Sequence, residues 1–418
     1  MFLSSIARCR DGMTATALVS ILALPAQARA SSLSLSDALA RVNERAPEVV
    51  LSDYATREVG ARRASAGILL PVNPRLQVDI RPPLDGSSIR DLGYGATLDA
   101  LFDLGGAPSA RIREVERDVE LAQAQRNIEL VHARLRAYAA YVSAQLAELR
   151  AVEARAGIEI ARRVLDAAQQ RIAAGAGSDF ERASAQLELS RIEAAEQAAL
   201  RDREEQVMEL RDVLDMAAEQ PLELTTRIEE PPGLVVLSQY LTQAQTKHPD
   251  LVASQARLAS LSATRVRLER ETFPKLGLYA GVDAAPKSPV YGIVGISGEI
   301  PVAQRNQGPR AVVARATESE QTRREILRRR IAREITVAWS SHERRRAELD
   351  VLTRSALPAA ERSFELAEAG WKAGRFDWFR VALAARDLVE VRAQRVEALA
   401  ALWSQRLTLA RARGGDVP

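Results

Sequence analysis

The chain has 418 residues, 47% hydrophobic and 27% charged, a composition that favours a large folded core over disorder. Its 58 basic and 55 acidic residues give a formal net charge of only +3, too small an excess to indicate a nucleic-acid surface. With three His and one Cys, the chain lacks the ligands for a zinc finger, a cysteine cluster or a His-rich metal site.

The first thirty residues have the pattern of a secretory signal peptide. Arg8 and Arg10 supply positive charge, and residues 13–24 form an apolar stretch that is too short to span a bilayer. An A-x-A cleavage site at 28–30 follows, so we expect a signal peptide at 1–30 and a mature chain that begins at Ser31. A buried N-terminal helix is the alternative.

Two halves of the chain repeat one sequence plan. Residues 47–52 (PEVVLS) resemble 249–254 (PDLVAS) at an offset of 202 residues. Residues 74–76 (PRL) resemble 274–276 (PKL) at an offset of 200. A duplication explains both matches, and chance likeness between Ala-rich helices is the alternative.

Each half reads as a helix, two strands, a very long helix and a return helix. A Pro-rich junction at 229–233 separates them. We therefore expect a first repeat at 31–230, a second repeat at 231–413 and a short tail at 414–418.

Long runs without helix breakers predict helices of unusual length. Residues 109–172 contain no Pro, and apolar residues recur at steps of three and four from Ile112 to Val142. This seam predicts side-by-side helix packing. A second run covers 310–369, where we expect Pro358 to kink the helix.

A turn and a return helix follow each long run. The turns are expected at 173–178 and 373–376, where glycines interrupt the helical pattern. The two antiparallel helical hairpins would then cover about 109–216 and 309–412.

Four short segments alternate between apolar and polar or small residues, the period of β-strands. They lie at about 74–82, 92–103, 275–284 and 290–301. About 9–11 tilted residues cross a bilayer as one strand of a barrel. A soluble sheet of two hairpins is the alternative, although isolated hairpins leave their edges unpaired.

Proline and glycine gather where strands meet helices. We expect Gly105, Gly106 and Gly308 to adopt backbone angles closed to other residues. Prolines at these boundaries would end strand or helix pairing. We assign the strand–helix transitions to these residues: Pro71, Pro74, Gly105, Gly106, Pro274, Arg305, Asn306 and Gly308. Ordinary loop residues are the alternative.

This plan resembles the TolC-like outer-membrane efflux factors over 31–413. The sequence FDLGG at 102–106 resembles the family's exit from its second strand, and IPVAQRNQG at 300–308 resembles the exit in the second repeat. RNQG at 305–308 and LPVNP at 70–74 resemble the CzcC-like heavy-metal branch.

The resemblance implies an α+β fold. Duplicated long α-helical hairpins would form a coiled-coil tunnel, and four β-strands per subunit would contribute to a trimeric 12-stranded transmembrane β-barrel. It also implies a homotrimer in the Gram-negative outer membrane, in contact with its lipid, that extends into the periplasm. A periplasmic membrane-fusion adaptor and an inner-membrane resistance–nodulation–division (RND) pump are the implied partners, with no nucleic acid.

The implied function is the passive exit duct of a tripartite efflux system for solutes, with heavy-metal ions as candidates. The outer-membrane duct of a type I protein secretion system, served by an ABC exporter, is an alternative. A non-channel coiled-coil protein of the envelope is an alternative of another class.

The resemblance also assigns the hairpin tips. Gly175, Gly177 and Gly374 would shape the turns where the adaptor docks, although they could simply end helices. The gate candidates are Trp371, Phe376, Asp377 and Arg380. Relatives often carry Asp at the places of Arg380 and Leu383.

Two alternatives stay open at this gate. Arg380 could pair with Asp377 one helical turn earlier instead of facing a tunnel. The aromatic residues could pack between the hairpins instead of closing the passage.

Catalysis has little support in the sequence. His132, His248 and His342 are far apart and are expected to be ordinary helix or cap residues. We find no phosphate-binding loop and no nucleophile constellation. The protein is therefore expected to be no enzyme and to have no catalytic, cofactor-binding or metal site.

Overall fold

The computed structural model describes residues 31–82, 92–218, 222–285 and 288–415. The expected signal peptide at 1–30 lies outside the described residues. So do most of the first loop between strands, part of the second loop and the end of the expected tail.

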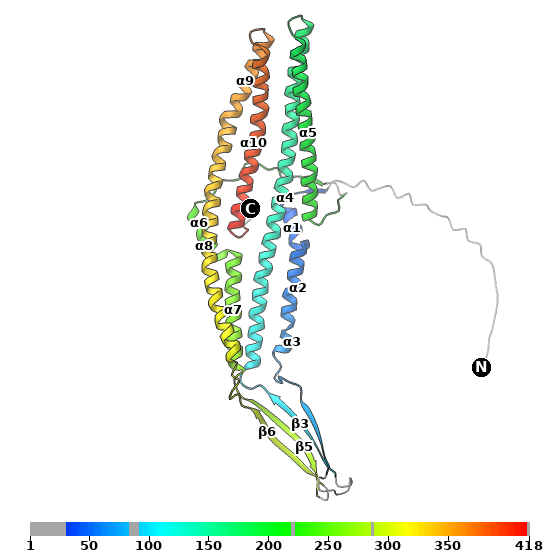
Figure 1. Ribbon diagram of the computed structural model, residues 1–418, viewed down its shortest axis with the longest axis vertical. Helices are drawn as coiled ribbons and strands as arrows, with labels where there is room; N and C mark the ends of the chain where they lie inside the picture. Colours follow the sequence, from blue (N-terminus) through cyan, green and yellow to red (C-terminus); the bar gives the residue numbers. More distant parts are fainter. Residues whose placement is uncertain (1–30, 83–91, 219–221, 286–287, 416–418) are drawn as a thin grey trace, which may run out of the picture.

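The molecule is a long rod with a sheet at one end and two helical hairpins at the other (Figure 1). Its first half contains, in chain order, β1 (Ser31–Leu33), α1 (Leu35–Arg45), α2 (Pro47–Ala61), α3 (Arg63–Ala66), β2 (Arg75–Arg81), β3 (Gly93–Phe102), α4 (Ala107–Ala173), α5 (Asp179–Val213) and β4 (Leu222–Leu224). Its second half contains α6 (Leu237–Lys247), α7 (Pro249–Arg270), β5 (Lys275–Ala284), β6 (Tyr291–Glu299), α8 (Gln307–Val351), a π-helical segment (Leu352–Ala356), α9 (Leu357–Lys372) and α10 (Trp378–Ala412).

The helices lie side by side in a layer. Contacts join α8 to α7, α7 to α4 and α4 to α2 in the half next to the sheet (Figure 1). In the other half, α9 contacts α10, α10 contacts α4 and α4 contacts α5. The long helix α4 runs through both halves and is therefore the common partner of the layer.

The sheet has the strand order β2-β3-β5-β6, with every neighbouring pair antiparallel. Its register sorts the side chains by chemistry. One cross-strand row is Leu76, Leu98, Ala280 and Val294, and the next row, on the opposite face, is Gln77, Thr97, Gly281 and Ile293. Leu76, Leu98 and Val294 are exposed, so one face of this sheet is an uncovered apolar surface.

The opposite face of the sheet carries polar contacts between strands. Arg81 forms an ion pair with Asp283, and the Ser297 hydroxyl donates to Asp99 at 2.8 Å. Small residues such as Gly95 lie between these groups and leave room for them. The sheet is therefore apolar on one side and polar on the other.

A core near the middle of the rod joins both halves of the chain. Tyr138 of α4 packs edge-on against Trp403 of α10, with ring centroids 6.1 Å apart. The Tyr141 hydroxyl donates to the Leu33 carbonyl at 3.1 Å and accepts from the Thr226 amide at 3.0 Å. These bonds anchor the parallel pair β1–β4, which the sequence did not predict because three-residue strands show no readable period.

Pro358 does not end the long helix of the second half. The π-helical segment lies directly before it, and α9 continues on the other side. Proline removes one backbone donor from the helical ladder, and a wider turn lets the chain continue past this gap. The structure thus shows a local change of helix type at the place where the sequence predicts a kink.

His342 is a fully buried side chain of α8. Neither ring nitrogen has a hydrogen-bond partner within the described part of the chain, and the Glu343 carboxylate is 3.7 Å from Nδ1. Burial, and to a smaller extent the charge of Arg406, lowers the pKa of His342 below its ordinary value. The folded protein therefore holds this histidine neutral.

This burial predicts a loss of stability in acid. The unfolded chain binds a proton at His342 more readily than the folded chain does. Above pH ~6.5 the side chain is neutral in both states, and as the pH falls below that value its protonation favours the unfolded chain and lowers the stability of the protein. The unfolding temperature in mild detergent should fall by a few degrees more for the wild type than for His342→Leu between pH ~7.5 and ~5.5. Equal slopes for both proteins would contradict the assignment.

Candidate functional site

The first hairpin tip reverses the chain between α4 and α5. Gly175 has a φ of 72°, in the left-handed region, and its amide donates to the Ile172 carbonyl at 2.9 Å. The Arg171 carbonyl accepts from the amides of Ala176 and Gly177. A Cβ on Gly177 would lie 2.8 Å from the Ile172 nitrogen, so this position needs glycine for close approach.

The second tip, between α9 and α10, has the same geometry. Gly374 has a φ of 70°, and its amide donates to the Trp371 carbonyl at 2.9 Å. The Gly370 carbonyl accepts from Arg375 and Phe376. Both tips thus end a helix with a left-handed glycine that satisfies the last carbonyls.

At the strand–helix boundaries, the structure places the left-handed residues at equivalent positions. Gly106 has a φ of 79° directly before α4, and Asn306 has a φ of 55° directly before α8. Asn is one of the few other residues that adopt this conformation readily, and the Asn306 side chain also donates to the Leu268 carbonyl at 3.1 Å.

The expectation for Gly308 was wrong. Its backbone is not left-handed, and a Cβ there would have no neighbour within 4 Å. Asn306 makes the turn instead, so Gly308 is free to be an ordinary first-turn residue of α8. Gly105 is needed for a different reason than expected, since its φ is not positive but a Cβ would collide with Phe273.

The remaining transition residues lie around these turns. Pro74 and Pro274 directly precede β2 and β5, and Pro71 lies in the bend that follows α3. The Arg305 guanidinium donates to the Pro301 carbonyl at 3.1 Å and thereby closes the loop before α8.

A buried ion pair fixes the first transition, and the sequence did not reveal it. Asp103 is buried and accepts from Arg111 at 2.8 Å. The same guanidinium donates to the carbonyls of Ala66 and Ile68 at 3.1 and 2.8 Å. Arg111 thus ties the end of β3 to the end of α3, and only its eight-residue spacing from Asp103 could have suggested the pair.

The structure places Trp371 inside the tip and not on its surface. The side chain is fully buried and packs edge-on against Trp378, with ring centroids 5.4 Å apart. The Arg171 guanidinium lies 5.3 Å from the Trp371 ring centroid and donates to the Trp371 carbonyl at 2.7 Å. Of the two alternatives for this residue, its position fits packing between the hairpins.

Glu368 connects the hairpins beside this tryptophan. Its carboxylate pairs with Arg163 of α4 and accepts from Lys372 at 2.8 Å. Burial alone would raise the pKa of Glu368, but hydrogen bonds from Lys372 and Arg163 outweigh it and hold the pKa below its ordinary value. The carboxylate therefore stays ionised and links α4 to α9.

Asp377 and Arg380 do not form an ion pair among the described residues, so the first alternative for Arg380 is not seen. Asp377 caps α10, because its carboxylate accepts from the Arg380 backbone amide at 3.0 Å. The exposed Arg380 guanidinium lies 5.2 Å from the ring centroid of Phe376. Arg380 is therefore held by an aromatic ring and keeps its charge on the surface.

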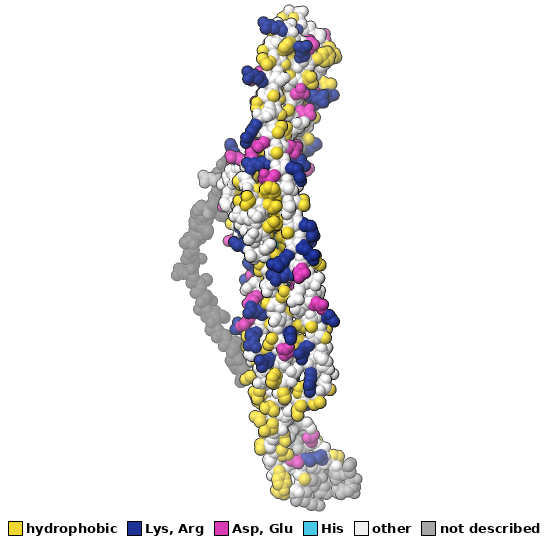
Figure 2. All heavy atoms as spheres, turned by 90° about the vertical axis from the view of Figure 1, so that its left-hand side faces the viewer, with side chains coloured by type: hydrophobic (Ala, Val, Ile, Leu, Met, Phe, Trp, Pro, Cys, Tyr) yellow, Lys and Arg dark blue, Asp and Glu magenta, His cyan; other side chains and the backbone are white. Residues whose placement is uncertain are grey.

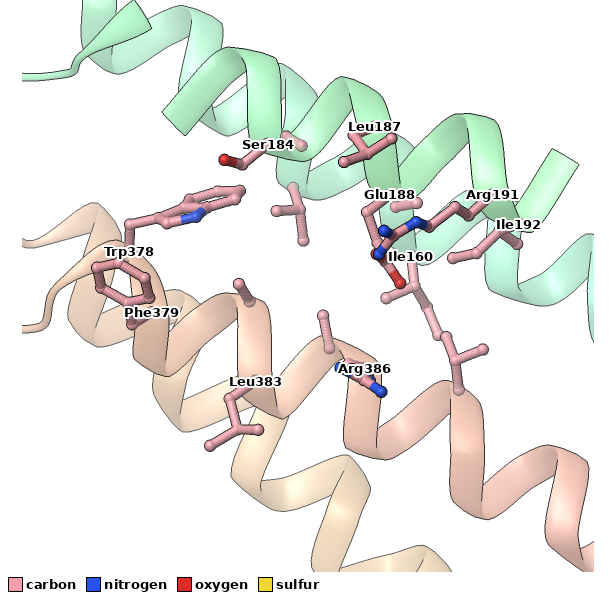
Figure 3. Close-up of a pocket in the computed structure, with 16 residues that line it drawn as sticks. Ile160, Ser184, Leu187, Glu188, Arg191, Ile192, Trp378, Phe379, Leu383 and Arg386 are labelled. Atoms are coloured by element: carbon pink, nitrogen blue, oxygen red, sulfur yellow. The ribbon is translucent and has the colours of Figure 1, made fainter. Parts of the chain in front are cut away.

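An open groove runs beside the tips between α5 and α10 (Figure 3). We call it the tip groove. Ile160 and neighbouring residues of α4 form its floor, Leu187 and Ile192 line it from α5, and Phe379 and Leu383 line it from α10. Leu187, Phe379 and Leu383 are exposed, so the groove presents uncovered apolar side chains.

The three histidines are not brought together. His132 is exposed on α4, whereas His248 caps α7 by accepting from the Asp250 amide at 3.3 Å. Burial lowers the pKa of His248. No group of three or more His, Cys, Asp and Glu side chains in the described ranges is arranged to hold a metal ion.

None of the helices in the described ranges combines the length and apolar character needed to cross a membrane.

The tip glycines make a stability prediction with an internal control. Alanine at Gly175 or Gly374 must adopt a left-handed conformation, which costs about 1–2 kcal/mol. Gly308→Ala should instead stabilise by about 0.4–1 kcal/mol, because it only restricts the unfolded chain. Chemical unfolding in mild detergent measures all three variants, and a tip variant as stable as Gly308→Ala would contradict the geometry.

Comparisons with known proteins agree with this architecture. The chain is 27% identical over 328 residues to the cobalt-zinc-cadmium resistance protein CzcC of Cupriavidus metallidurans, 76% of each chain. It is 28% identical over 291 residues to the nickel-cobalt-cadmium resistance protein NccC of Alcaligenes xylosoxydans xylosoxydans, 68% of this chain and 64% of that one.

The fold is also found among solved structures. The outer-membrane channel OprN superposes with a TM-score of 0.72 at 18% identity, covering 91% of this chain and 90% of that one. No protein-family model matches the sequence. The chain thus resembles CzcC and NccC in sequence over two thirds or more of its length, and it shares the fold of the outer-membrane channel OprN.

Proposed function

We propose that three copies of this chain form a passive exit duct through the outer membrane and the periplasm. The observation that carries the proposal is the four-stranded sheet, which has one exposed apolar face and one polar face. Such a sheet suits a wall between lipid and water.

The sheet edges support assembly. Strands β2 and β6 each pair with a single neighbour in the described sheet. One copy has too few strands to close a barrel, since closed barrels start at about eight. Because β2 and β6 run in opposite directions, β6 of one copy can pair with β2 of the next and keep every neighbouring pair of strands antiparallel. Three copies joined in this way give a 12-stranded barrel.

The hairpin tips lie at the end of the rod farthest from the sheet (Figure 1). In an outer-membrane protein this end faces the periplasm, where an adaptor and an inner-membrane pump would couple to the duct. The tip groove, with its exposed Leu187, Phe379 and Leu383, is the surface that we assign to the adaptor's helices. The RND class of pump follows from the family resemblance.

The cargo that we propose is a divalent heavy-metal ion. The support is the printed names of the relatives, which concern resistance to cobalt, zinc, cadmium and nickel. These names also favour efflux over type I protein secretion. The two-faced sheet favours a channel over a coiled-coil structural protein of the envelope.

Purified protein in planar bilayers tests the proposal. We expect a homotrimer by mass measurement in mild detergent and ion conductance after insertion. A monomer or dimer without conductance would contradict the duct. A second measurement compares the heavy-metal tolerance of cells with and without the gene. If the purified trimer conducts but deletion of the gene leaves tolerance unchanged, the proposed cargo is wrong and the duct is not.

We also propose that Arg380 contributes to ion selection at the tip. Its charge is exposed beside Phe376, and three copies around an axis would form a cationic ring. In a narrow passage such a ring disfavours cations. An adaptor that opens the tip would then also move the three charges apart.

Arg380→Asp should raise cation preference in single-channel recordings under a salt gradient, because it replaces the cationic ring by an anionic one. The control is Arg344→Asp on α8, which also removes an exposed arginine but lies far along the rod. Reversal potentials that shift equally for both variants, or for neither, would remove Arg380 from the selective site.

A further inference from the structure

The middle of α8 carries a high density of positive charge. Residues 323–333 contain six arginines and one glutamate. Figure 2 views the rod from the α8 side and shows Lys and Arg side chains along its helical part. Like charges four residues apart on a helix repel one another, so this sequence costs stability unless something outside the helix compensates for it.

Three of these arginines lack a counter-charge. Other arginines of α8 pair with a carboxylate of the same helix, as Arg330 does with Glu334 at 2.7 Å. By contrast, Arg324, Arg328 and Arg329 form no ion pair within the described ranges. The Nε atom of Arg324 is buried and has no hydrogen-bond partner in the described part of the chain.

The same three arginines line two adjoining hollows at the corner between α6 and α7. The first hollow, of about 340 Å³, lies between α6, α7 and α8 and is lined by Arg328 and Arg329. The second, of about 610 Å³, is bordered by α4, α7 and the end of α6, and Arg324 lines it from α8. Gln245 and Leu251 line both hollows, so the two are neighbours. We call them together the corner site.

The first hollow of the corner site has an apolar floor and a charged rim. Its residues Leu251, Ile331 and Ile335 are buried, whereas Arg328 and Arg329 are exposed. Water screens a guanidinium beside apolar surface less than one on an open helix. An anion that binds there therefore gains more from charge-assisted hydrogen bonds.

The charges that line the corner site do not balance. Arg117 of α4 joins the three arginines of α8, and Glu120 is the one carboxylate among the described residues of the lining. Glu120 is already paired with Arg117 at 2.6 Å. The site therefore keeps a net positive charge, which the three arginines of α8 carry.

The position and size of the corner site indicate a small ligand from the aqueous side. Arg324 lies about 26 Å along α8 from Gln307, the first residue of this helix beside the sheet. With the sheet in the membrane, lipid headgroups do not reach that level, because their layer is only about 5–8 Å thick. Hollows of about 300–1,000 Å³ are typical of small-molecule sites.

We propose that the corner site binds a small polyvalent oxyanion, such as a polycarboxylate or a polyphosphate. One charged group of the ligand meets Arg328 and Arg329, and another meets Arg324. A planar guanidinium donates two parallel hydrogen bonds to a carboxylate or phosphate group. A ligand with two such groups fits because the arginines lie in two hollows that meet at Gln245. This site goes beyond the proposed duct and does not depend on it.

Isothermal titration calorimetry of the full-length protein in mild detergent tests the site, with citrate and pyrophosphate as probes. We expect one bound ligand per chain. Arg324→Gln and Arg328→Gln should each weaken binding by about tenfold or more, because each removes a charged hydrogen-bond donor. Acetate, which carries a single charge, should bind at least about tenfold more weakly than citrate.

Arg333→Gln is the matched control. Arg333 is an exposed arginine of the same helix, forms no ion pair within the described ranges and lines neither hollow. Its replacement removes the same charge, but salt screens charges that lie more than about 8 Å apart, so affinity should change by less than about twofold. An equal loss of affinity for Arg333→Gln would show that the probes follow general charge, and it would overturn the site.

Thermal unfolding gives a second measurement. Without ligand, Arg328→Gln should unfold at the same temperature as the wild type or slightly above it, because one like-charge contact is removed. Saturating citrate should raise the unfolding temperature of the wild type by a few degrees and that of Arg328→Gln by less. An equal rise in both proteins would contradict the assignment of Arg328.

The outcomes also decide the class of ligand. If neither citrate nor pyrophosphate binds at concentrations up to about 10 mM, the small polyanion is wrong. If polyglutamate binds instead and Arg324→Gln abolishes that binding, the corner site recognises an acidic protein, and the proposed ligand class is overturned. None of these measurements uses conductance, so the duct is tested separately.

Discussion

The packing of helices along α4 is the interaction on which the rest of the structure depends. This one helix contacts α2 and α7 in the half next to the sheet, and α5 and α10 in the half that carries the tips. It therefore sets the position of β3, which leads into it, relative to the first tip, which follows it. A single continuous helix transmits this alignment over the length of the rod without a joint.

The side-by-side arrangement gives each copy two unlike edges. At the level of the sheet these are β2 and β6, beside the sheet they are α2 and α8, and near the tips they are α5 and α9. The edges with β2, α2 and α5 all belong to the first half of the chain, and the others all belong to the second. An assembly that joins first half to second half satisfies every level at once, which is why a closed ring suits this fold better than a two-fold dimer.

Sequence patterns predicted the elements whose causes are local. Period-two alternation located the four long strands, because successive side chains of a strand point to opposite faces of the sheet. Glycine marked both tips, because each turn needs a residue with a positive φ. Features that depend on distant partners escaped. The pair between Asp103 and Arg111 involves α3, and the burial of Trp371 requires the other hairpin.

The candidate site was predictable in place but not in role. The gate candidates lie at a tip, where Asp377 serves as a helix cap and Trp371 is part of the core. Both roles are common for these residue types, since Asp is a preferred helix N-cap and Trp contributes a large apolar surface to cores. For Gly308 and Asn306, the motif was right but the wrong member was expected to make the turn.

The two halves differ in side-chain size at corresponding positions of α2 and α7. Helix α7 carries Ala253 and Ala256, whereas α2 carries Leu51 and Tyr54 at the corresponding places. The contact of α7 lies within one chain, so folding brings it together and little extra apolar area is needed. A contact between copies must also offset the loss of translational and rotational freedom on association. Larger apolar side chains at those positions supply additional burial, of roughly 25 cal/mol per Å². The divergence between α2 and α7 therefore has the direction that an interface between copies requires.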